Sequence, residues 1–412
     1  MSSEQSKDKI FTSIDQLPSL RRNLYDYGFD YEPCNNSHCA NESYDLGLEY
    51  LIFSGGGVSG MAYLGVAEEL EKQRVLSYIR YFIGSSSGAV ICTLLALGAD
   101  SKFLHEEFRK CNMSEFLDVG GRCYSNNGAM DMFKNCKDGL FDLIKHFGAA
   151  RGYKFVKWME EMFCKLGWSP ETTFAELYNK TGKMLVITGT SINTHSTLYF
   201  SRSSYPYLKI IDAAHMSMVL PFVYQPVLFE DVLCSKGPRI VIDGGVLNNL
   251  ALSACDVTNE FGQTLAYNRK AVGFILVENG QIAADYQAID SIYKFSVEVV
   301  KTLHTNMMIN QSQQPYFWDR VVPIDVHIDT MAFDASREDL NKTVEAGRTA
   351  MRGFLNSRRA MIKEHGRLPN SLFIPSDQLV LAGVTRLSNT LLENTKIYET
   401  NPCNFASNKI VS

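Results

Sequence analysis

From residue 48 onward, short apolar runs alternate with longer segments of mixed polarity. The short runs predict buried strands, at Leu48–Phe53, Tyr81–Ile83, Met184–Thr188, Ile240–Ile242, Val272–Val277 and Val321–Val326. The longer segments predict helices, at Val58–Val75, Ser87–Leu97, Lys102–Lys110, Asp131–His146, Lys154–Leu166, Ile289–Met308 and Leu340–Glu364. Strands that alternate with helices indicate an α/β fold of three layers, in which helices cover both faces of a mostly parallel central sheet.

Residues 1–47 depart from this pattern, because they are rich in Ser, Asp, Asn and Tyr and show no long period. We expect them to form an N-terminal extension. Residues 48–256 contain the glycine-rich motifs described below and are predicted to form the catalytic region. Residues 257–412 are predicted to form a C-terminal α/β region packed on the same domain.

Composition narrows the classes of function. Of the 412 residues, 45% are hydrophobic and 21% are charged, as in ordinary globular proteins, and the net charge of −5 gives no case for nucleic-acid binding. The ten cysteines include no Cys-x-x-Cys pair, so we expect no metal site. We expect no other cofactor either. Met1–Leu20 lacks the apolar stretch of a signal peptide, and the longest apolar run, Gly88–Ala99, is too short to span a bilayer. These features predict a soluble, cytoplasmic protein.

The first motif of chemical interest is a glycine-rich loop, Ser54–Gly60, between a predicted strand and a predicted helix. Glycines let the backbone turn sharply and leave N–H groups unobstructed, and the start of a helix adds partial positive charge. Such a loop can hold a phosphate or a developing oxyanion. Taken alone it also fits a nucleotide-binding loop or a plain tight turn.

The second motif, Gly84-Ser85-Ser86-Ser87-Gly88, also lies between a strand and an apolar helix. It has the Gly-x-Ser-x-Gly pattern of a nucleophile elbow, in which the central Ser86 projects outward and Ser85 and Ser87 point elsewhere. A Ser/Gly turn that caps a helix is the alternative.

The third motif, Asp243-Gly244-Gly245, directly follows a short strand. An isolated Asp-Gly-Gly is more often a simple turn. The combination is more informative, because the glycine loop precedes Ser86 by one strand–helix–strand unit. Neighbouring parallel strands end at the same edge of a sheet, so we expect the loop and Ser86 to face one another. A nucleophile beside convergent N–H donors is the equipment of acyl transfer.

With the three motifs in this order, the chain resembles the patatin-like phospholipases. That family is marked by a Gly-Gly-Gly-x-x-Gly oxyanion loop, a Gly-x-Ser-x-Gly elbow and an Asp-Gly-Gly or Asp-Gly-Ala aspartate. Thr173–Leu177 and Ser217–Val227 also resemble segments of the family, and the resemblance covers about residues 48–255. It implies a patatin-like fold and a phospholipase A-type acyl hydrolase that acts through a Ser-Asp dyad.

The resemblance also implies roles for individual residues. Ser86 would attack the ester carbonyl and Asp243 would accept its proton. Backbone N–H groups of the loop would hold the oxyanion, and further glycines would shape the motifs: Gly55, Gly56, Gly57 and Val58 for the oxyanion hole, and Gly60, Gly84, Gly88, Gly244 and Gly245 for the motifs. The chain departs from the family at Ser59, where Arg or Lys is frequent, and at Leu250, where proline is common.

Two other classes of function compete. An α/β-hydrolase with a Ser-His-Asp triad is permitted by chain order, since His304, His327 and His365 follow Asp243. In that fold, however, the oxyanion loop does not lie one unit before the elbow. A catalytically inactive binding module would not require both Ser86 and Asp243. A P-loop NTPase is set aside, because the loop lacks the Gly-Lys-Ser/Thr ending.

The expected partners are a phospholipid or other acyl-lipid substrate and, transiently, a membrane surface; whether a protein activates the enzyme stays open. Met216–Leu220 is a candidate for apolar insertion, although a buried core turn accounts for it equally well. The basic residues Arg348–Lys363 predict either a membrane-facing surface or, more simply, a solvated helix face.

Overall fold

The computed structural model describes residues 46–118, 145–231, 237–258, 264–278, 289, 292–314, 317–365 and 410–411. Residues 1–45 of the predicted N-terminal extension and residues 131–144 of the predicted helix Asp131–His146 lie outside these residues.

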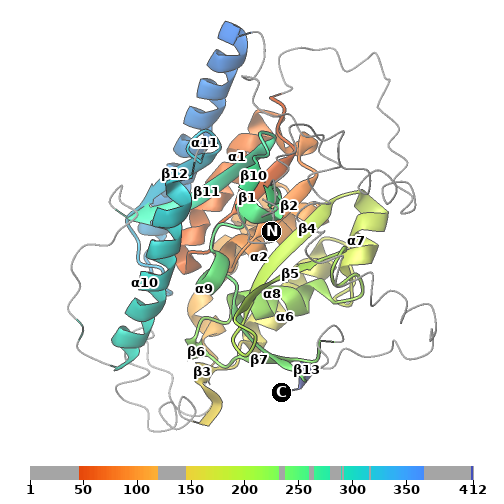
Figure 1. Cartoon of the computed structure of the whole chain (residues 1–412), viewed down its shortest axis with the longest axis vertical. Helices are drawn as coiled ribbons and strands as arrows, with labels where there is room; N and C mark the ends of the chain where they lie inside the picture. Colours follow the sequence, from red (N-terminus) through yellow and green to blue (C-terminus); the bar gives the residue numbers. More distant parts are fainter. Residues whose placement is uncertain are drawn as a thin grey trace, which may run out of the picture. The chain divides into compact units, whose positions relative to one another are not determined.

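A central sheet of nine strands organises the described part of the chain (Figure 1). Its order is β12-β11-β1-β2-β4-β8-β7-β13, and β5 pairs with β4. The first five strands of this order are mutually parallel: β12 (Val321–Val326), β11 (Ala271–Glu278), β1 (Tyr50–Phe53), β2 (Tyr81–Gly84) and β4 (Met184–Ser191). Strand β1 lies within a predicted apolar run, and the other four strands contain or match one, as expected of parallel strands buried on both faces.

Each of the remaining strands of the sheet pairs antiparallel with its neighbours. The antiparallel members are β5 (Ser196–Ser201), β8 (Arg239–Asp243), β7 (Val227–Phe229) and β13 (Ile410–Val411). Two small pairs lie apart from the sheet: β3 (Gly148–Ala150) with β6 (Phe222–Tyr224), and β9 (Val257–Thr258) with β10 (Thr264–Ala266). The sheet is therefore mostly parallel at its centre, as predicted, with an antiparallel flank that the sequence did not reveal.

Helices cover both faces of the sheet, which confirms the predicted three-layer α/β architecture. The α-helices of the described residues are α1 (Ala62–Lys72), α2 (Ser87–Leu97), α3 (Ser101–Lys110), α6 (Tyr153–Lys165), α7 (Phe174–Thr181), α8 (Ile210–Met218), α9 (Gly245–Asn248), α10 (Ile292–Ser312) and α11 (Arg337–His365). The 3₁₀ helices are η2 (Gly57–Met61), η3 (Leu76–Tyr78), η4 (Met113–Phe116) and η5 (Leu252–Ala254).

Strand β1 shows how the layers form. Its side chains alternate between two buried clusters: Leu51 and Phe53 join the cluster that includes α1, α2 and α11, while Tyr50 and Ile52 join the cluster on the opposite face. Alternation with a period of two is the geometry of a strand. Strands from residues 271–326 pair directly with β1 and with each other. The boundaries of the predicted regions stay a prediction.

Candidate active site

Ser86 lies at the sharp turn between β2 and α2. It is the N-cap of α2 with φ 51° and ψ −126°, a conformation that non-glycine residues rarely adopt and that costs roughly 1–3 kcal/mol. The turn is tight because α2 starts against the end of β1: a Cβ atom on Gly88 would lie 2.5 Å from the carbonyl oxygens of Phe53 and Ser54. Only a glycine fits there, so the elbow predicted from the sequence has the expected local geometry.

Buried side chains hold the elbow from both sides. The backbone N–H of Ser86 donates to the Ser217 hydroxyl at the end of α8, with 2.9 Å between nitrogen and oxygen. Ser85 points inward, where it donates to the Asn248 carbonyl at 2.8 Å and accepts from the Thr188 hydroxyl at 2.6 Å. The strained conformation of Ser86 is thus fixed by hydrogen bonds from distant parts of the chain.

Asp243 is the last residue of β8, and the chain direction of β8 is opposite to that of β1 and β2, which lead into the other two motifs. Strand β8 runs antiparallel to β4, and Asp243 pairs with Gly189, two residues past the Ile187 that pairs with Gly84 of the elbow. Its side chain is buried; one oxygen accepts from the Gly245 N–H at 2.7 Å, and the carboxyl also interacts with the Ser86 side chain. Burial raises the pKa of Asp243 from 3.8 to about 6, against the lowering effect of these two hydrogen bonds.

The glycine loop lies directly against Ser86. A Cβ atom on Gly55 would be 2.9 Å from the Cβ of Ser86. Gly57 has φ +52°, and a Cβ there would lie 2.2 Å from the Thr330 carbonyl oxygen, so this position requires glycine. The loop and the elbow are therefore side by side, as their places in the sequence predicted.

Hydrogen bonds divide the four residues predicted for the oxyanion hole into two pairs. The Gly55 N–H donates to the Asn249 side-chain oxygen at 3.0 Å, and the Val58 N–H donates to the Thr330 carbonyl at 3.0 Å. Within the described residues, the N–H groups of Gly56 and Gly57 have no such acceptor. The N–H groups of Gly55 and Val58 thus already have acceptors, and the assignment of the four residues to the oxyanion hole stays a prediction.

The other predicted glycines occupy close contacts around the same centre. A Cβ atom would lie 2.5 Å from Ser87 Oγ at Gly60, 2.5 Å from Ala89 N at Gly84, 2.1 Å from Thr188 Oγ1 at Gly244 and 2.7 Å from Asn249 Oδ1 at Gly245. Each therefore marks a place where two segments approach too closely for a side chain.

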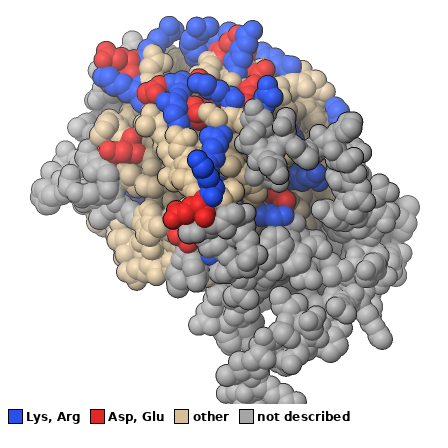
Figure 2. All heavy atoms as spheres, turned by 90° about the horizontal axis from the view of Figure 1, so that it is seen from above, with Lys and Arg blue, Asp and Glu red and all other residues tan. Residues whose placement is uncertain are grey.

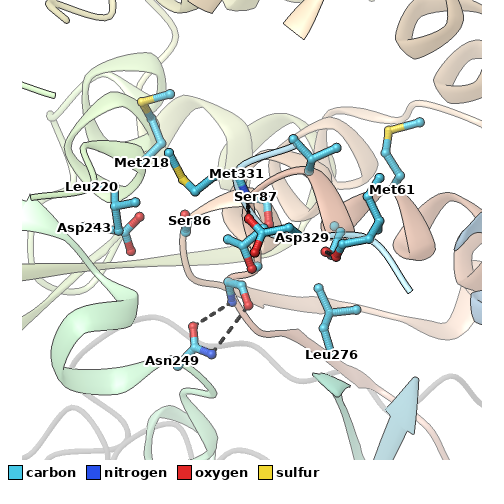
Figure 3. Close-up of a pocket in the computed structure, with 18 of the residues that line it drawn as sticks. Met61, Ser86, Ser87, Met218, Leu220, Asp243, Asn249, Leu276, Asp329 and Met331 are labelled. Atoms are coloured by element: carbon cyan, nitrogen blue, oxygen red, sulfur yellow. Dashed lines mark hydrogen bonds between the residues drawn. The ribbon is translucent and has the colours of Figure 1, made fainter. Parts of the chain in front are cut away.

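Two residues that support the site were given no role by the sequence. Asn249 clamps the loop through both ends of its amide, since its nitrogen also reaches the Gly55 carbonyl at 3.4 Å (Figure 3). Ser217 positions the elbow, and its own carbonyl accepts from the Gly244 N–H at 3.2 Å. The Asn pair that follows Asp-Gly-Gly after two apolar residues was a visible signal for Asn249, and the resemblance of Ser217–Val227 to a segment of the family was the signal for Ser217.

A cavity of about 500 Å³ opens at Ser86 and Asp243. In Figure 3, Met218 and Leu220 lie with Asp243 on one side of Ser86, and Asp329 and Leu276 lie on the other. Much of the lining is apolar and aromatic, which suits a hydrocarbon chain. Its walls come from segments on either side of residue 256, so the predicted C-terminal region completes the cavity.

The histidines do not form a triad in the described residues. His304 lines the cavity and packs near Gly245, but it has no hydrogen bond to Ser86 or Asp243, and burial lowers its pKa to about 4. His327 is exposed on the surface beside Asp325, and the side chain of His365 lies outside the described residues. The described residues also contain no group of three or more His, Cys, Asp or Glu that could hold a metal.

The structure decides between the two interpretations left open for Met216–Leu220. Met216, Ser217 and Val219 are fully buried, while Met218 and Leu220 line the cavity. This run is part of the core, so it is not a membrane-inserting surface. No helix in the part of the chain that the structure describes is long and apolar enough to cross a membrane.

The basic face of α11 is largely occupied within the protein. Blue and red side chains are interspersed over this end of the molecule in Figure 2. Arg348 pairs with Glu68 at 2.6 Å, Arg352 pairs with Glu69 at 3.1 Å, and Arg359 donates to Gln73 at 2.9 Å. Arg358 is buried and donates to the Leu46 carbonyl at 2.7 Å. These contacts join α11 to α1 and favour a structural role over a free membrane anchor.

Comparison with known proteins agrees with the motifs. The model of a family described as patatin-like phospholipase matches residues 51–256. "Probable lipid hydrolase 463L" of Invertebrate iridescent virus 6 is 25% identical over 252 residues, which are 60% of this chain and 74% of that protein. "Triacylglycerol lipase 4" of Saccharomyces cerevisiae is 25% identical over 282 residues, which are 61% of this chain and 28% of that protein.

A further viral relative and a solved structure complete the picture. "Uncharacterized protein R571" of Acanthamoeba polyphaga mimivirus is 25% identical over 73% of this chain and 91% of its own length. The crystal structure of VipD from Legionella pneumophila covers 87% of this chain and 78% of its own, with a TM-score of 0.44 and 15% identity.

Proposed function

We propose that this chain, which belongs to the patatin-like phospholipase family and is a lipid acyl hydrolase, cleaves fatty-acyl esters through a Ser86–Asp243 dyad. The observation that carries the proposal is the contact between the strained elbow serine and a buried carboxyl group whose pKa is raised to about 6. A carboxylate with such a pKa is a competent proton acceptor at neutral pH.

The proposed reaction has two halves. In the first, Ser86 Oγ forms a bond to the ester carbonyl carbon while its proton passes to Asp243; the proton then goes to the alcohol oxygen as the ester bond breaks. In the second, Asp243 takes a proton from water as the water oxygen attacks the acyl-enzyme carbonyl carbon; the proton then passes from Asp243 to Ser86 Oγ as the bond between Ser86 and the acyl group breaks and the fatty acid leaves. The N–H groups of Gly56 and Gly57 are suited to hold the oxyanion in both halves, because they face no acceptor of their own among the described residues.

The competing functions have less support. A triad would need a histidine between Ser86 and the acid, and Asp243 contacts Ser86 without one. An inactive binding module would have no use for a serine held in a costly conformation beside a buried acid. Residues 48–256 are proposed as the catalytic region, with residues 257–412 supplying part of the cavity wall.

The pH dependence of hydrolysis tests the proposal. Since Asp243 must be ionised to accept the proton, kcat/KM should rise with pH through about 6 and level off above that value. The measurement is fatty-acid release from micellar phosphatidylcholine and triacylglycerol between about pH 4 and about pH 9. His304→Gln is the control, because His304 is the one histidine among the described residues that lines the cavity. A midpoint that vanishes in His304→Gln would favour the triad instead.

We also propose a transient contact with lipid surfaces through α10. Phe295, Val299 and Leu303 follow one another at intervals of four residues and are 53%, 42% and 48% exposed, so they form an apolar stripe on one face of the helix. The same helix contributes His304 and Met308 to the cavity. A stripe of this kind suits the headgroup–acyl boundary of a membrane that supplies the substrate.

Liposome sedimentation tests this contact. The triple variant Phe295→Ser/Val299→Ser/Leu303→Ser should lower binding to phosphatidylcholine vesicles by roughly tenfold or more, because three apolar side chains no longer leave water. The control triple Tyr78→Ser/Ile192→Ser/Tyr207→Ser removes similarly exposed apolar groups elsewhere and should bind normally. Wild-type binding should change little with salt. Binding that collapses as salt rises would point to a basic anchor and contradict the stripe.

A further inference from the structure

The cavity at Ser86 is lined by two chemically different groups of residues, each called a wall here. One wall is formed by α3, η4 and α6 and is wholly apolar: Phe108, Met113, Phe116, Phe155 and Trp158. Its rings pack against each other, with centroids 5.2 Å apart for Phe108–Trp158 and 5.6 Å apart for Phe116–Phe155. A hydrocarbon chain gains most by lying against this wall, so the acyl group belongs there.

The second wall is charged. It consists of Glu278 at the end of β11, Glu298 and Lys301 on α10, and Asp329 after β12; these four residues are called the charged wall. Asp329 lies on the far side of Ser86 from Met218 and Leu220 (Figure 3). With the acyl chain on the apolar wall and the oxyanion on the glycine loop, the alcohol part of the substrate faces the charged wall.

The ammonium of Lys301 is already bound. Its Nζ lies 3.1 Å from Asp329 Oδ2 and 3.4 Å from Glu298 Oε1. Burial lowers the pKa of Lys301, but the charges of Asp329 and Glu298 outweigh burial, so the net shift is upward and the group stays protonated. A phosphate that approached this ammonium would also approach the two carboxylates that flank it.

Other neighbours add no positive charge. Among the described residues of the lining, Lys301 is the sole lysine or arginine, against the three carboxylates of the charged wall. His304 is neutral above its low pKa. Ser59 of the glycine loop carries no charge, and its buried hydroxyl donates to the Ile328 carbonyl at 2.8 Å. Three carboxylates and one ammonium leave an excess of two negative charges where the alcohol part enters.

We propose that the charged wall makes the enzyme select acyl lipids whose head group carries no net negative charge, such as acylglycerols and zwitterionic phospholipids, and reject anionic phospholipids. The inference rests on the proposed acyl hydrolase function and names its substrate class. A negative charge on the head group is repelled by an uncompensated carboxylate a few ångströms away in a partly solvated cleft. The discrimination should therefore be on the order of tenfold.

The test uses short-chain lipids as monomers, so that vesicle charge plays no part. The kcat/KM for hexanoate release would be measured for dihexanoylglycerol, dihexanoylphosphatidylcholine and dihexanoylphosphatidylglycerol. The wild type should act on the first two roughly tenfold better than on the anionic phosphatidylglycerol. Glu278→Gln, at an exposed position, and Glu298→Gln/Asp329→Asn should each narrow this gap to about threefold or less by raising the rate on phosphatidylglycerol.

Matched controls separate this effect from general changes. Glu161→Gln/Glu338→Gln removes two exposed carboxylates that do not line the cavity and should leave the gap unchanged. Hydrolysis of uncharged p-nitrophenyl hexanoate reports on the dyad itself, so each lipid rate is divided by the rate of the same variant on this ester before the gaps are compared. Equal rates on phosphatidylglycerol and phosphatidylcholine, or a gap that persists in both cavity variants, would overturn the inference. Failure to hydrolyse any of these esters would instead overturn the proposed function, and the inference with it.

Discussion

Ser86→Ala is expected to lower fatty-acid release by roughly four orders of magnitude or more, because the only atom lost is the proposed nucleophile. The fold should survive, since the hydrogen bond from this position to Ser217 uses the backbone N–H, which alanine retains. Turnover on phosphatidylcholine micelles and the melting temperature, measured together, check both halves of the prediction. Near-normal turnover would show that Ser86 is not the nucleophile.

The flanking serines provide controls within the same elbow. Ser87 Oγ is buried without a hydrogen-bond partner among the described residues, so Ser87→Ala should keep activity within several-fold. Ser85→Ala leaves the Asn248 carbonyl unpaired and should lower stability by about 1–3 kcal/mol, with a smaller loss of activity than Ser86→Ala.

Asp243→Asn is the second large effect. The amide keeps the size of the side chain and an oxygen that can accept from the Gly245 N–H, but it cannot take a proton from Ser86. We expect turnover to fall by roughly three orders of magnitude or more, with KM changed little. His304→Ala should not approach this loss. A histidine variant that is equally inactive yet folded would support the triad.

The same substitution should not destabilise the protein. The pKa of Asp243 is raised from 3.8 to about 6, so the folded chain holds the proton more tightly than the unfolded chain. Stability from this group is present below about pH 4 and is lost as pH rises through about 6. At neutral pH the buried carboxylate costs on the order of 3 kcal/mol. Asparagine removes that charge, so Asp243→Asn should melt at the same temperature as wild type or higher.

The centre of the fold was predictable because its signals are local. Parallel strands buried on both faces are short apolar runs, and β1, β2, β4, β11 and β12 all coincide with such runs. The antiparallel direction of β8 was not predictable. Its apolar run Ile240–Ile242 would suit a parallel or an antiparallel strand, and only the pairing with β4 shows which one forms. Short strands such as β3 and β6 carry no period that a sequence can display.

The candidate site divides in the same way. The sequence identified Ser86, Asp243 and the glycines because they lie at turns whose residue types are distinctive. Which loop N–H groups remain open depends on Asn249 and Thr330, far away in the chain, and so the engagement of Gly55 and Val58 could not be foreseen. The charged wall follows no motif, because its members come together only through the packing of β11, α10 and the segment after β12.

Active-site labelling distinguishes activation of Ser86 by Asp243 alone from activation by a histidine. A fluorophosphonate probe forms a stable bond only with an activated serine, and peptide mass spectrometry locates the adduct. We expect one adduct, on Ser86, which forms in wild type and in His304→Ala at similar rates and at least about a hundredfold more slowly in Asp243→Asn. An adduct on another serine, or labelling that persists in Asp243→Asn and is lost in His304→Ala, would contradict this expectation.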